Sequence, residues 1–522
     1  MLMSSGQHHD AEKDNDLEKV IANLHHLGIR SEDVPGHGRC FLVDFENEDP
    51  FLAKNWSYGR KWATTGIVGL TGFLVAWSSA IDSVIVPQAM QEFGTSEIVE
   101  NLATALFLIG FGLGSLVSGP LSETIGRNLV YLGSLAIFMV WVMASGLAPN
   151  IQSQLVFRTL AGFFGCTPLT TFGGSTSDIW DSAQRTYVFP VMACLSFLGP
   201  FLSPMVGSCM SSNPIPICRT DLLTLNDTVI GQSSIISWRW TEWITLIMAA
   251  LITSAIFLTA RESYPPVLLE WKTAHLRRLF GDERFVSAAT LHKKSFLSRM
   301  RVSIVRPFEF FFTQAIVVLW CAYLSLVYVI LFTFLPGYNY IFGRTYGFGQ
   351  GSTGLMFIGL NVGFLIALAM CPFVYSRYIR VMRKHNGAAP PEERLVYANL
   401  TAPLLPISLF WMAWTARSDI SFWSPLIASV AFGISMQGIF ISAYQYLIDS
   451  FEAFAASALV SLTLSRYIAA GLMTVAANPM YEALHVEWTL TLLGCLGVIC
   501  TPIPYCLYYY GAKIRARTVP GK

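Results

Sequence analysis

A few charged side chains inside long apolar stretches are the residues of this chain best suited to chemistry. Arg158 lies in the run LVFRTLAGFFG, and Arg466 lies within another apolar stretch. A charge inside an apolar helix is costly unless it is paired or hydrated, so we expect Arg158 to face the protein interior. The acids near such stretches are scarce: Asp82, Glu242 and Asp449. They could take up and release protons, and the sequence does not single out one of them as the proton carrier.

Polar and aromatic residues in the middle of other apolar stretches could contact a small solute. Gln437, Phe440 and Tyr444 share one helical face, because Gln437 and Tyr444 are seven residues apart with Phe440 between them. Tyr328 and Phe332 form a similar pair. The candidate substrate-binding residues are therefore Tyr328, Phe332, Asn361, Gln437, Phe440 and Tyr444. The alternative, that these side chains only pack or bridge helices, stays open.

The elements that must position these residues are membrane-spanning helices. Of 522 residues, 53% are hydrophobic and only 13% are charged, whereas soluble domains carry about 25% charged residues. A helix that crosses a bilayer needs about 20 mostly apolar residues. Twelve such stretches are centred near Gly72, Leu108, Phe138, Phe163, Leu198, Ala249, Ser325, Asn361, Ile407, Met436, Ile468 and Gly497. The sequence therefore predicts an all-α polytopic membrane protein with twelve transmembrane helices in two bundles of six.

Polar segments divide this predicted architecture into five parts. We expect an acid-rich N-terminal tail, partly disordered, a first bundle, a hydrophilic central loop, a second bundle and a short C-terminal tail; these cover residues 1–61, 62–260, 261–312, 313–510 and 511–522. Lys and Arg collect in the central loop, in the loop after span eight and in the C-terminal tail. This asymmetry predicts that the central loop and both termini are cytosolic.

The longest loop of the opposite parity, about residues 209–237, is then predicted to lie outside. It contains the sequon Asn226-Asp227-Thr228, so Asn226 is a predicted glycosylation site. Cys209 and Cys218 fall in or beside the same loop, and the sequence leaves a disulfide between them open. The net charge of +1 gives no sign of a nucleic-acid partner.

Two motifs in the first half resemble signatures of a known superfamily. The segment GPLSETIGRN after span two puts Glu123 and Arg127 at a tight turn, where they could pair in one conformation and separate in another. Its spacing matches the loop signature G-x-L-x-[DE]-x-x-G-R of the major facilitator superfamily, with Glu123 in place of the commoner Asp. The segment around Arg158 resembles that superfamily's fourth-span pattern.

Span five carries the segment GPFLSPMVG, whose Gly199 and Pro200 would bend the helix and allow close helix contact. This segment resembles the fifth-span motif of proton-coupled antiporters within the superfamily, although Pro204 replaces one motif glycine. The region before span one, the RESYPPVLL loop after span six, the YLIDSF segment and Arg466 also resemble fungal drug:proton antiporters. The resemblance covers about residues 45–517.

This resemblance implies a major facilitator fold, with a central cavity between the halves that opens alternately to either side. It further implies export of small organic molecules in exchange for protons, by a monomer in the plasma membrane or, alternatively, the vacuolar membrane. The partners would be the organic substrate, protons and the lipid bilayer. The residues expected to gate or couple are Glu123, Arg127, Arg158, Gly199, Pro200, Asp449 and Arg466.

Other functional classes fit the sequence less well. A nucleotide-driven pump would need a G-x-x-x-x-G-K-[ST] loop, which the chain lacks. Neither zinc-ligand spacing nor a membrane-adjacent His cluster is present, so we predict no metal, no cofactor and no enzyme activity. An importer, a polyamine transporter and a non-transporting sensor of the same fold remain alternatives. The scarcity of mid-span acids favours neutral or hydrophobic compounds, such as drugs, toxins or fungal secondary metabolites, over polyamines.

Overall fold

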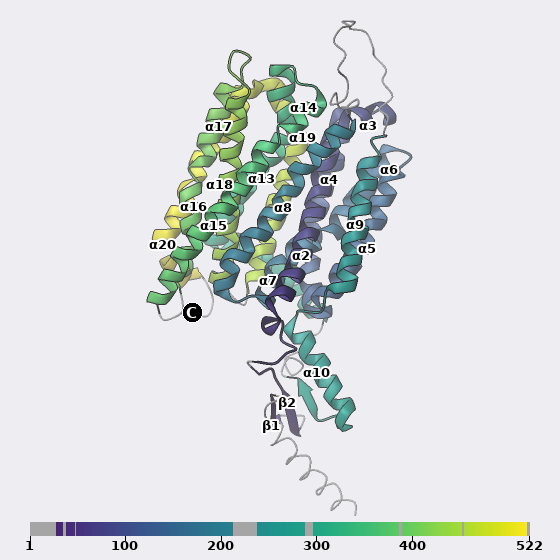
Figure 1. The fold of residues 1–522 in the computed structure, drawn as a ribbon, viewed down its shortest axis with the longest axis vertical. Helices are drawn as coiled ribbons and strands as arrows, with labels where there is room; N and C mark the ends of the chain where they lie inside the picture. Colours follow the sequence, from purple (N-terminus) through teal and green to yellow (C-terminus); the bar gives the residue numbers. More distant parts are fainter. Residues whose placement is uncertain are drawn as a thin grey trace, which may run out of the picture.

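The computed structural model is an elongated helical bundle with a small β-sheet at one end (Figure 1). It describes residues 28–34, 38–46, 48–211, 237–287, 296–385, 389–451 and 454–518. The predicted glycosylation site Asn226 and Cys218 lie outside these residues. We call the end of the bundle that carries the β-sheet the sheet end, and the opposite end the far end.

The N-terminal half supplies six crossings of the bundle. Its helices are α2 (Tyr58–Ala80), α3 (Val86–Phe93), α4 (Glu97–Ile125), α5 (Arg127–Gly146), α6 (Ile151–Gly165), α7 (Thr167–Ile179), α8 (Ser182–Ser211) and α9 (Trp240–Thr259), with a 3-10 turn, η3 (Ile81–Val84), after α2. The fourth predicted span is thus two helices, α6 and α7, that join at Cys166. Pro168 in the first turn of α7 lacks the N–H that would continue the ladder of α6.

The C-terminal half supplies the other six crossings. Its elements are α12 (Phe296–Thr313), α13 (Ala315–Tyr338), η5 (Asn339–Arg344), α14 (Gln350–Leu355), α15 (Ile358–Lys384), η6 (Pro391–Leu395), α16 (Val396–Thr401), α17 (Leu404–Thr415), α18 (Trp423–Phe451), α19 (Ala455–Cys500) and α20 (Pro502–Thr518). Within α19 the backbone leaves the helical conformation at His485, with φ 58° and ψ 177°. The part after His485 continues through α20 and packs along α16, where the Tyr505 hydroxyl donates to the Asn399 carbonyl.

The described residues therefore contain the twelve crossings that the sequence predicts. Length and composition alone identify 10 segments apolar enough to span a membrane, because span four is split into two short helices and spans eleven and twelve run on as one. Large apolar side chains such as Phe257, Leu258 and Phe312 are more than 70% exposed on the outside of the bundle. Such a surface requires lipid around it.

Glycines let neighbouring helices approach closely in the N-terminal half. A Cβ added at Gly162 of α6 would lie 2.0 Å from the carbonyl oxygen of Phe107 in α4. A Cβ at Gly114 would lie 2.1 Å from the carbonyl oxygen of Phe163. Small residues at such contacts allow membrane helices to pack backbone against backbone. This packing helps to fix the position of Arg158, which lies about one turn before these contacts on α6.

The sheet end carries a small three-stranded sheet that the sequence analysis did not predict. Strands β1 (Ile29–Val34) and β2 (Gly38–Val43) pair antiparallel, and β3 (Phe285–Ser287) of the central loop pairs parallel with β2. The sheet packs on α10 (Pro265–Phe280), and Lys272 Nζ lies 2.5 Å from Asp49 Oδ2. Only three residues of the central loop join the sheet, which is too short a segment for its hydrophobic alternation to be recognised in the sequence.

Candidate functional site

A small enclosed cavity lies between the two halves near the middle of the bundle. Its volume is about 30 Å³, which is roughly the space of one water molecule. Helices α2, α7 and α8 line it from the N-terminal half, and α13, α18 and α19 line it from the C-terminal half. We call this space the central cavity. Its lining residues are Ala76, Ser79, Leu169, Phe172, Ala193, Ser196, Phe197, Pro200, Tyr328, Leu331, Phe332, Phe440, Tyr444, Arg466 and Tyr467. A solute therefore requires the site to widen.

Four of the six candidate substrate-binding residues, Tyr328, Phe332, Phe440 and Tyr444, line this cavity. The other two, Asn361 and Gln437, are buried but do not line it. The amide of Asn361 donates to the Phe357 carbonyl at 3.1 Å within its own helix. Gln437 shares a helix face with Phe440 and Tyr444.

Phe197 of α8 also lines the cavity, where it packs edge-on against Phe440 at 4.7 Å between ring centroids. Phe197 and Tyr467 line the cavity but were not among the predicted residues, because a ring inside an apolar stretch more often packs than binds a solute.

Arg466 projects into the central cavity and is 1% exposed. Its guanidinium carbon lies 4.6 Å from the ring centroid of Tyr328, 5.0 Å from Tyr467, 5.2 Å from Phe440 and 5.4 Å from Tyr444. Its Nε and Nη1 atoms have no hydrogen-bond partner. Among the residues that the structure describes, no carboxylate lies within ion-pair distance of this guanidinium.

Arg158 of α6 contacts α2 and lies in a buried cluster with two acids. Its Nε lies 2.7 Å from Asp82 Oδ2, and its Nη1 lies 3.3 Å from Glu242 Oε1. Nη2 donates to the carbonyl of Ser78 at 2.7 Å, and the Ser145 hydroxyl donates to Glu242 at 3.0 Å. All three charged side chains are at most 5% exposed. The structure thus joins residues that the sequence could name only separately.

The Arg158 cluster and the central cavity meet in two consecutive residues of α2. Ser78 contacts Arg158, and Ser79 lines the cavity. Gly199 of α8 packs against the same helix, where an added Cβ would lie 2.5 Å from the Phe73 carbonyl oxygen and 2.8 Å from the Trp77 nitrogen. The neighbouring Pro200 lines the cavity. A movement of α2 against α8 would therefore affect the charged cluster and the cavity together.

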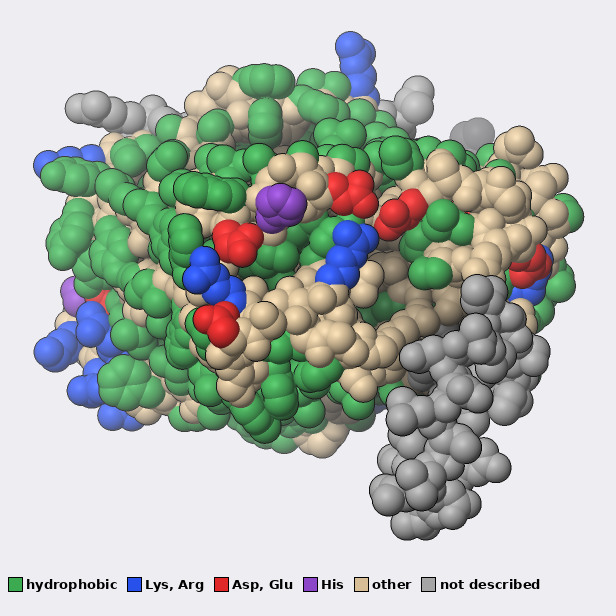
Figure 2. All heavy atoms as spheres, turned by 90° about the horizontal axis from the view of Figure 1, so that it is seen from above, with side chains coloured by type: hydrophobic (Ala, Val, Ile, Leu, Met, Phe, Trp, Pro, Cys, Tyr) green, Lys and Arg blue, Asp and Glu red, His purple; other side chains and the backbone are tan. Residues whose placement is uncertain are grey.

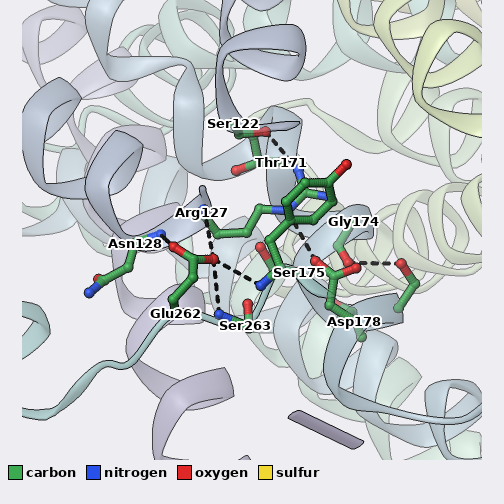
Figure 3. A network of polar contacts seen from close by, with 12 residues as sticks. Ser122, Arg127, Asn128, Thr171, Gly174, Ser175, Asp178, Glu262 and Ser263 are labelled. Carbon is green, nitrogen blue, oxygen red and sulfur yellow. Dashed lines mark hydrogen bonds and ion pairs between the residues drawn. The ribbon is translucent and has the colours of Figure 1, made fainter. Parts of the chain in front are cut away.

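At the sheet end, Arg127 does not pair with Glu123, the neighbour that the sequence suggested. Its Nε lies 3.1 Å from Asp178 Oδ2 at the end of α7, and its Nη1 donates to the Ser122 hydroxyl at 2.6 Å (Figure 3). Glu123 instead lines a vestibule of about 720 Å³ at this end, together with Arg127 and Asp449. One sequence signal pointed to Asp178: it is an acid near the end of the apolar fourth span, and that end lies at the sheet end, as Arg127 does.

Glu262 fixes the start of α5 beside this pair (Figure 3). Its carboxylate accepts the backbone N–H groups of Arg127 at 2.9 Å and Asn128 at 3.1 Å. A carboxylate at a helix N-terminus satisfies free N–H groups and complements the helix dipole. Gly126, at φ 109°, leaves room for it, because a Cβ there would lie 2.5 Å from Glu262 Oε2. This contact gives the RESYPP segment a structural role.

Polar contacts join the two halves at the sheet end. Arg394 of η6 lies 2.7 Å from Asp449 Oδ2 of α18, within its own half. It also donates to the Thr186 hydroxyl at 2.5 Å and to the Ser182 carbonyl at 3.2 Å, both on α8 of the other half. Asp449, a predicted coupling residue, therefore orients an arginine that holds the halves together.

The halves also meet at the far end. Gln350 of α14 donates to the Val84 carbonyl at 2.6 Å and accepts from Gln88 of α3 at 3.1 Å. Asn478 of α19 donates to Glu97 of α4. A vestibule of about 600 Å³ lies at this end, and Figure 2 shows charged side chains near the middle of a largely hydrophobic face. Polar contacts therefore join the two halves at both ends of the bundle.

No group of three or more His, Cys, Asp or Glu residues that could hold a metal occurs within the described parts of the chain. The site consists of a guanidinium among aromatic rings, a second guanidinium between two acids, and contacts between the halves at either end. Such an arrangement suits binding and conformational change.

Comparisons with known proteins agree with this architecture. The family model of the Major Facilitator Superfamily matches residues 68–474. The chain is 58% identical to the MFS-type transporter kojT of Aspergillus oryzae, over 91% of this chain and 82% of that protein. It is 31% identical to the transporter paaT of Penicillium rubens, over 91% and 82% of the respective chains. Among solved structures, the proton:xylose symporter XylE superposes with a TM-score of 0.60 at 15% identity, over 87% of this chain and 96% of that chain.

Proposed function

The chain belongs to the major facilitator superfamily, and from that premise we propose that it exports small organic compounds in exchange for protons. It is a multi-pass membrane transporter of small solutes and not an enzyme. The proposal adds the direction of transport, the coupling ion and the class of solute.

The buried cluster of Asp82, Arg158 and Glu242 carries the proposal of proton coupling. Two carboxyl groups share one guanidinium there, at 2.7 Å and 3.3 Å. If both acids were ionised, one net negative charge would be buried away from water, which is costly. Binding one proton removes that charge. The cluster can therefore exist in two protonation states that favour different surroundings, which is what coupling to a proton gradient requires.

The contact between the cluster and the central cavity supports a mechanism for that coupling. Ser78 holds Arg158 and Ser79 lines the cavity, so a shift of α2 on protonation changes the cavity wall. The hydrogen bonds of Arg394 at the sheet end and of Gln350 at the far end would break alternately as the two halves move relative to each other. Gly199 packs so tightly on α2 that it transmits this movement.

Export is supported by the resemblance of the Gly199–Pro200 segment to the antiporter motif of span five. The lining of the cavity argues against polyamines, because it includes the cation Arg466 and no carboxylate. Several aromatic rings favour a bulky or flat organic solute, such as a toxin or a fungal secondary metabolite. The transporters kojT and paaT, both of filamentous fungi, are compatible with that class.

We further propose that the sheet end faces the cytosol and that the protein acts as a monomer in the plasma membrane. Lys and Arg in the central loop support this orientation. Tags at about residue 285 and about residue 226, probed in intact and permeabilised cells, test it. Only the second tag should be labelled in intact cells, and glycosidase should shift the mobility of a protein that carries glycan on Asn226. Labelling of the central loop in intact cells would overturn the orientation.

Everted vesicles from a host without its own pumps test the function directly. A panel of fluorescent aromatic toxins is offered with an imposed inside-acid gradient. We expect uptake that an uncoupler stops and that needs no ATP. Uptake that persists with the uncoupler and requires ATP would show that the protein is not a secondary antiporter. The variant Gly133→Leu serves as a control for expression, since a Cβ at Gly133 meets no atom within 4 Å.

A further inference from the structure

We propose that the solute is a small, flat organic anion, such as a carboxylate, phenolate or enolate, whose charged oxygen is bound by Arg466. The inference rests on the proposed function and specifies its substrate class. It also replaces the expectation of neutral compounds that the scarcity of mid-span acids had favoured.

Arg466 differs from the other buried arginines of the described chain by its partners. Arg127, Arg158 and Arg394 each lie within 3.1 Å of a carboxylate oxygen. Arg466 is equally buried and makes no such pair with any described residue. An arginine side chain stays protonated in proteins, so its charge persists in this apolar setting. A buried cation without an anion is the feature that calls for an external partner.

The geometry around Arg466 leaves two of its three nitrogens, Nε and Nη1, without a hydrogen-bond partner while aromatic rings surround the guanidinium. Four aromatic rings lie within 5.4 Å of the guanidinium carbon. The rings attract the cation through their faces, and the Tyr444 hydroxyl interacts with the guanidinium. Nε and Nη1 nevertheless have no hydrogen-bond partner. An oxygen anion in the plane of the guanidinium would satisfy these donors, and such charge-assisted hydrogen bonds are among the strongest.

The shape of the surrounding rings favours a flat molecule. Phe440 and Tyr444 stack at 4.3 Å between centroids, and Phe111 stacks on Tyr467 at 4.1 Å across the two halves. Parting such stacks creates slots that accept another planar ring. The cavity of about 30 Å³ must widen to admit any solute, and separating stacked rings would widen it. The anion would then lie between rings with its oxygen on Arg466.

Binding to the purified full-length protein in detergent tests this inference. The probes are two matched pairs: 4-nitrophenol and 4-nitroanisole, and salicylate and salicylamide. Each is added at a pH at which the first member is ionised, and protection against thermal unfolding is titrated, since a ligand of the folded state raises its stability. We expect at least one anion to protect the protein at a concentration at which its neutral partner does not.

Variants assign the preference to Arg466. Arg466→Gln should weaken binding of the protecting anion at least about 30-fold, as expected when a buried charge pair loses one partner. Arg466→Lys keeps the charge and should retain part of the preference, which also covers the case that the Gln variant does not fold. Arg306→Gln is the matched control: Arg306 also stacks on a ring, Phe454 at 4.8 Å, but does not line the cavity.

Two outcomes overturn the inference. Either no anion binds better than its neutral partner, or the preference survives unchanged in both Arg466 variants. These failures are distinguishable from failure of the proposed function, because equilibrium binding needs no gradient. Proton-driven uptake of a neutral toxin with no anion preference would refute only the substrate class. Anion binding without gradient-driven uptake would refute only the antiporter.

Discussion

Two arginines at the centre of the molecule are equally buried and are stabilised in opposite ways. Arg158, in the N-terminal half, lies between the carboxyl groups of Asp82 and Glu242. Arg466, in the C-terminal half, is surrounded by aromatic rings and pairs with no described carboxylate. The first site has more acid than base, so its charge can be balanced by a proton. The second has an uncompensated cation, so its charge can be balanced by a bound anion. On the proposals made above, the first site would serve proton coupling and the second would serve recognition of the solute.

The largest expected effect is that of removing the cation from the first site. In Arg158→Ala both acids are left buried without a cation, and breaking a buried ion pair in this way costs about 3–5 kcal/mol. We expect gradient-driven uptake into everted vesicles to fall at least about a hundredfold. Surface biotinylation should find most of the protein at the membrane.

A charge-free triple variant separates transport from folding. Arg158→Met combined with Asp82→Asn and Glu242→Gln removes every charge of the cluster, so its thermal stability should exceed that of Arg158→Ala while transport stays absent. Full activity in Arg158→Ala would mean that this arginine only fills space, and the contrast between the two sites would lose its functional meaning.

The response of accumulation to a membrane potential reports the net charge moved per transport cycle, to which the proton and the solute both contribute. Moving one charge through 100 mV is worth about 2.3 kcal/mol, so 60 mV changes accumulation about tenfold per charge. Exchange of an anion for one proton moves two charges, and an inside-positive potential of about 60 mV in everted vesicles should raise accumulation about a hundredfold. Potentials set with potassium and valinomycin provide the measurement. A tenfold response would indicate a neutral solute with proton coupling intact.

Single replacements of Asp82 and Glu242 test whether the first site carries the coupling proton. In Asp82→Asn or Glu242→Gln one carboxylate faces one guanidinium, and the pair is neutral without a proton. Gradient-driven accumulation should then fall about tenfold or more, while exchange of labelled solute at equal pH changes little, because only the coupling charge is lost. The ratio of the two rates in the same vesicles is the measurement. Retention of uncoupler-sensitive accumulation by both variants would exclude the cluster as the proton site.

The smallest effect is expected at the contact that joins the two sites. Gly199→Leu forces a side chain against the backbone of α2 at Phe73 and Trp77, and such overpacking costs typically about 1–3 kcal/mol. Efflux should fall several-fold with normal delivery to the membrane. Gly133→Leu, at an exposed glycine of α5 with open space around it, should be unaffected. Equal loss in both variants would show a general effect of bulk and not a specific contact.

Much of this molecule was predictable from local signals. Runs of about 20 apolar residues predicted the crossings, and Phe440 and Tyr444 reached the cavity because helical periodicity puts them on one face. Contacts that depend on a neighbour from another helix could not be predicted from such signals. Glu123 is close to Arg127 in sequence, yet in this structure Arg127 forms its ion pair with Asp178 of α7. Gln437 shares a helical face with Phe440 and Tyr444, yet it does not line the cavity.

The sequence by itself determined that the chain crosses a membrane many times and that Arg158 is a costly charge in need of a partner. It also named Arg466, Asp82 and Glu242 as charged residues in or near apolar stretches. The free energy of placing a segment in a membrane depends on its residue types and on the length of the apolar run, and both can be read along the chain. Only the tertiary structure decided that three of these charges form one cluster and the fourth faces aromatic rings. Pairing depends on distances between helices that are remote in sequence, and close glycine contacts set those distances.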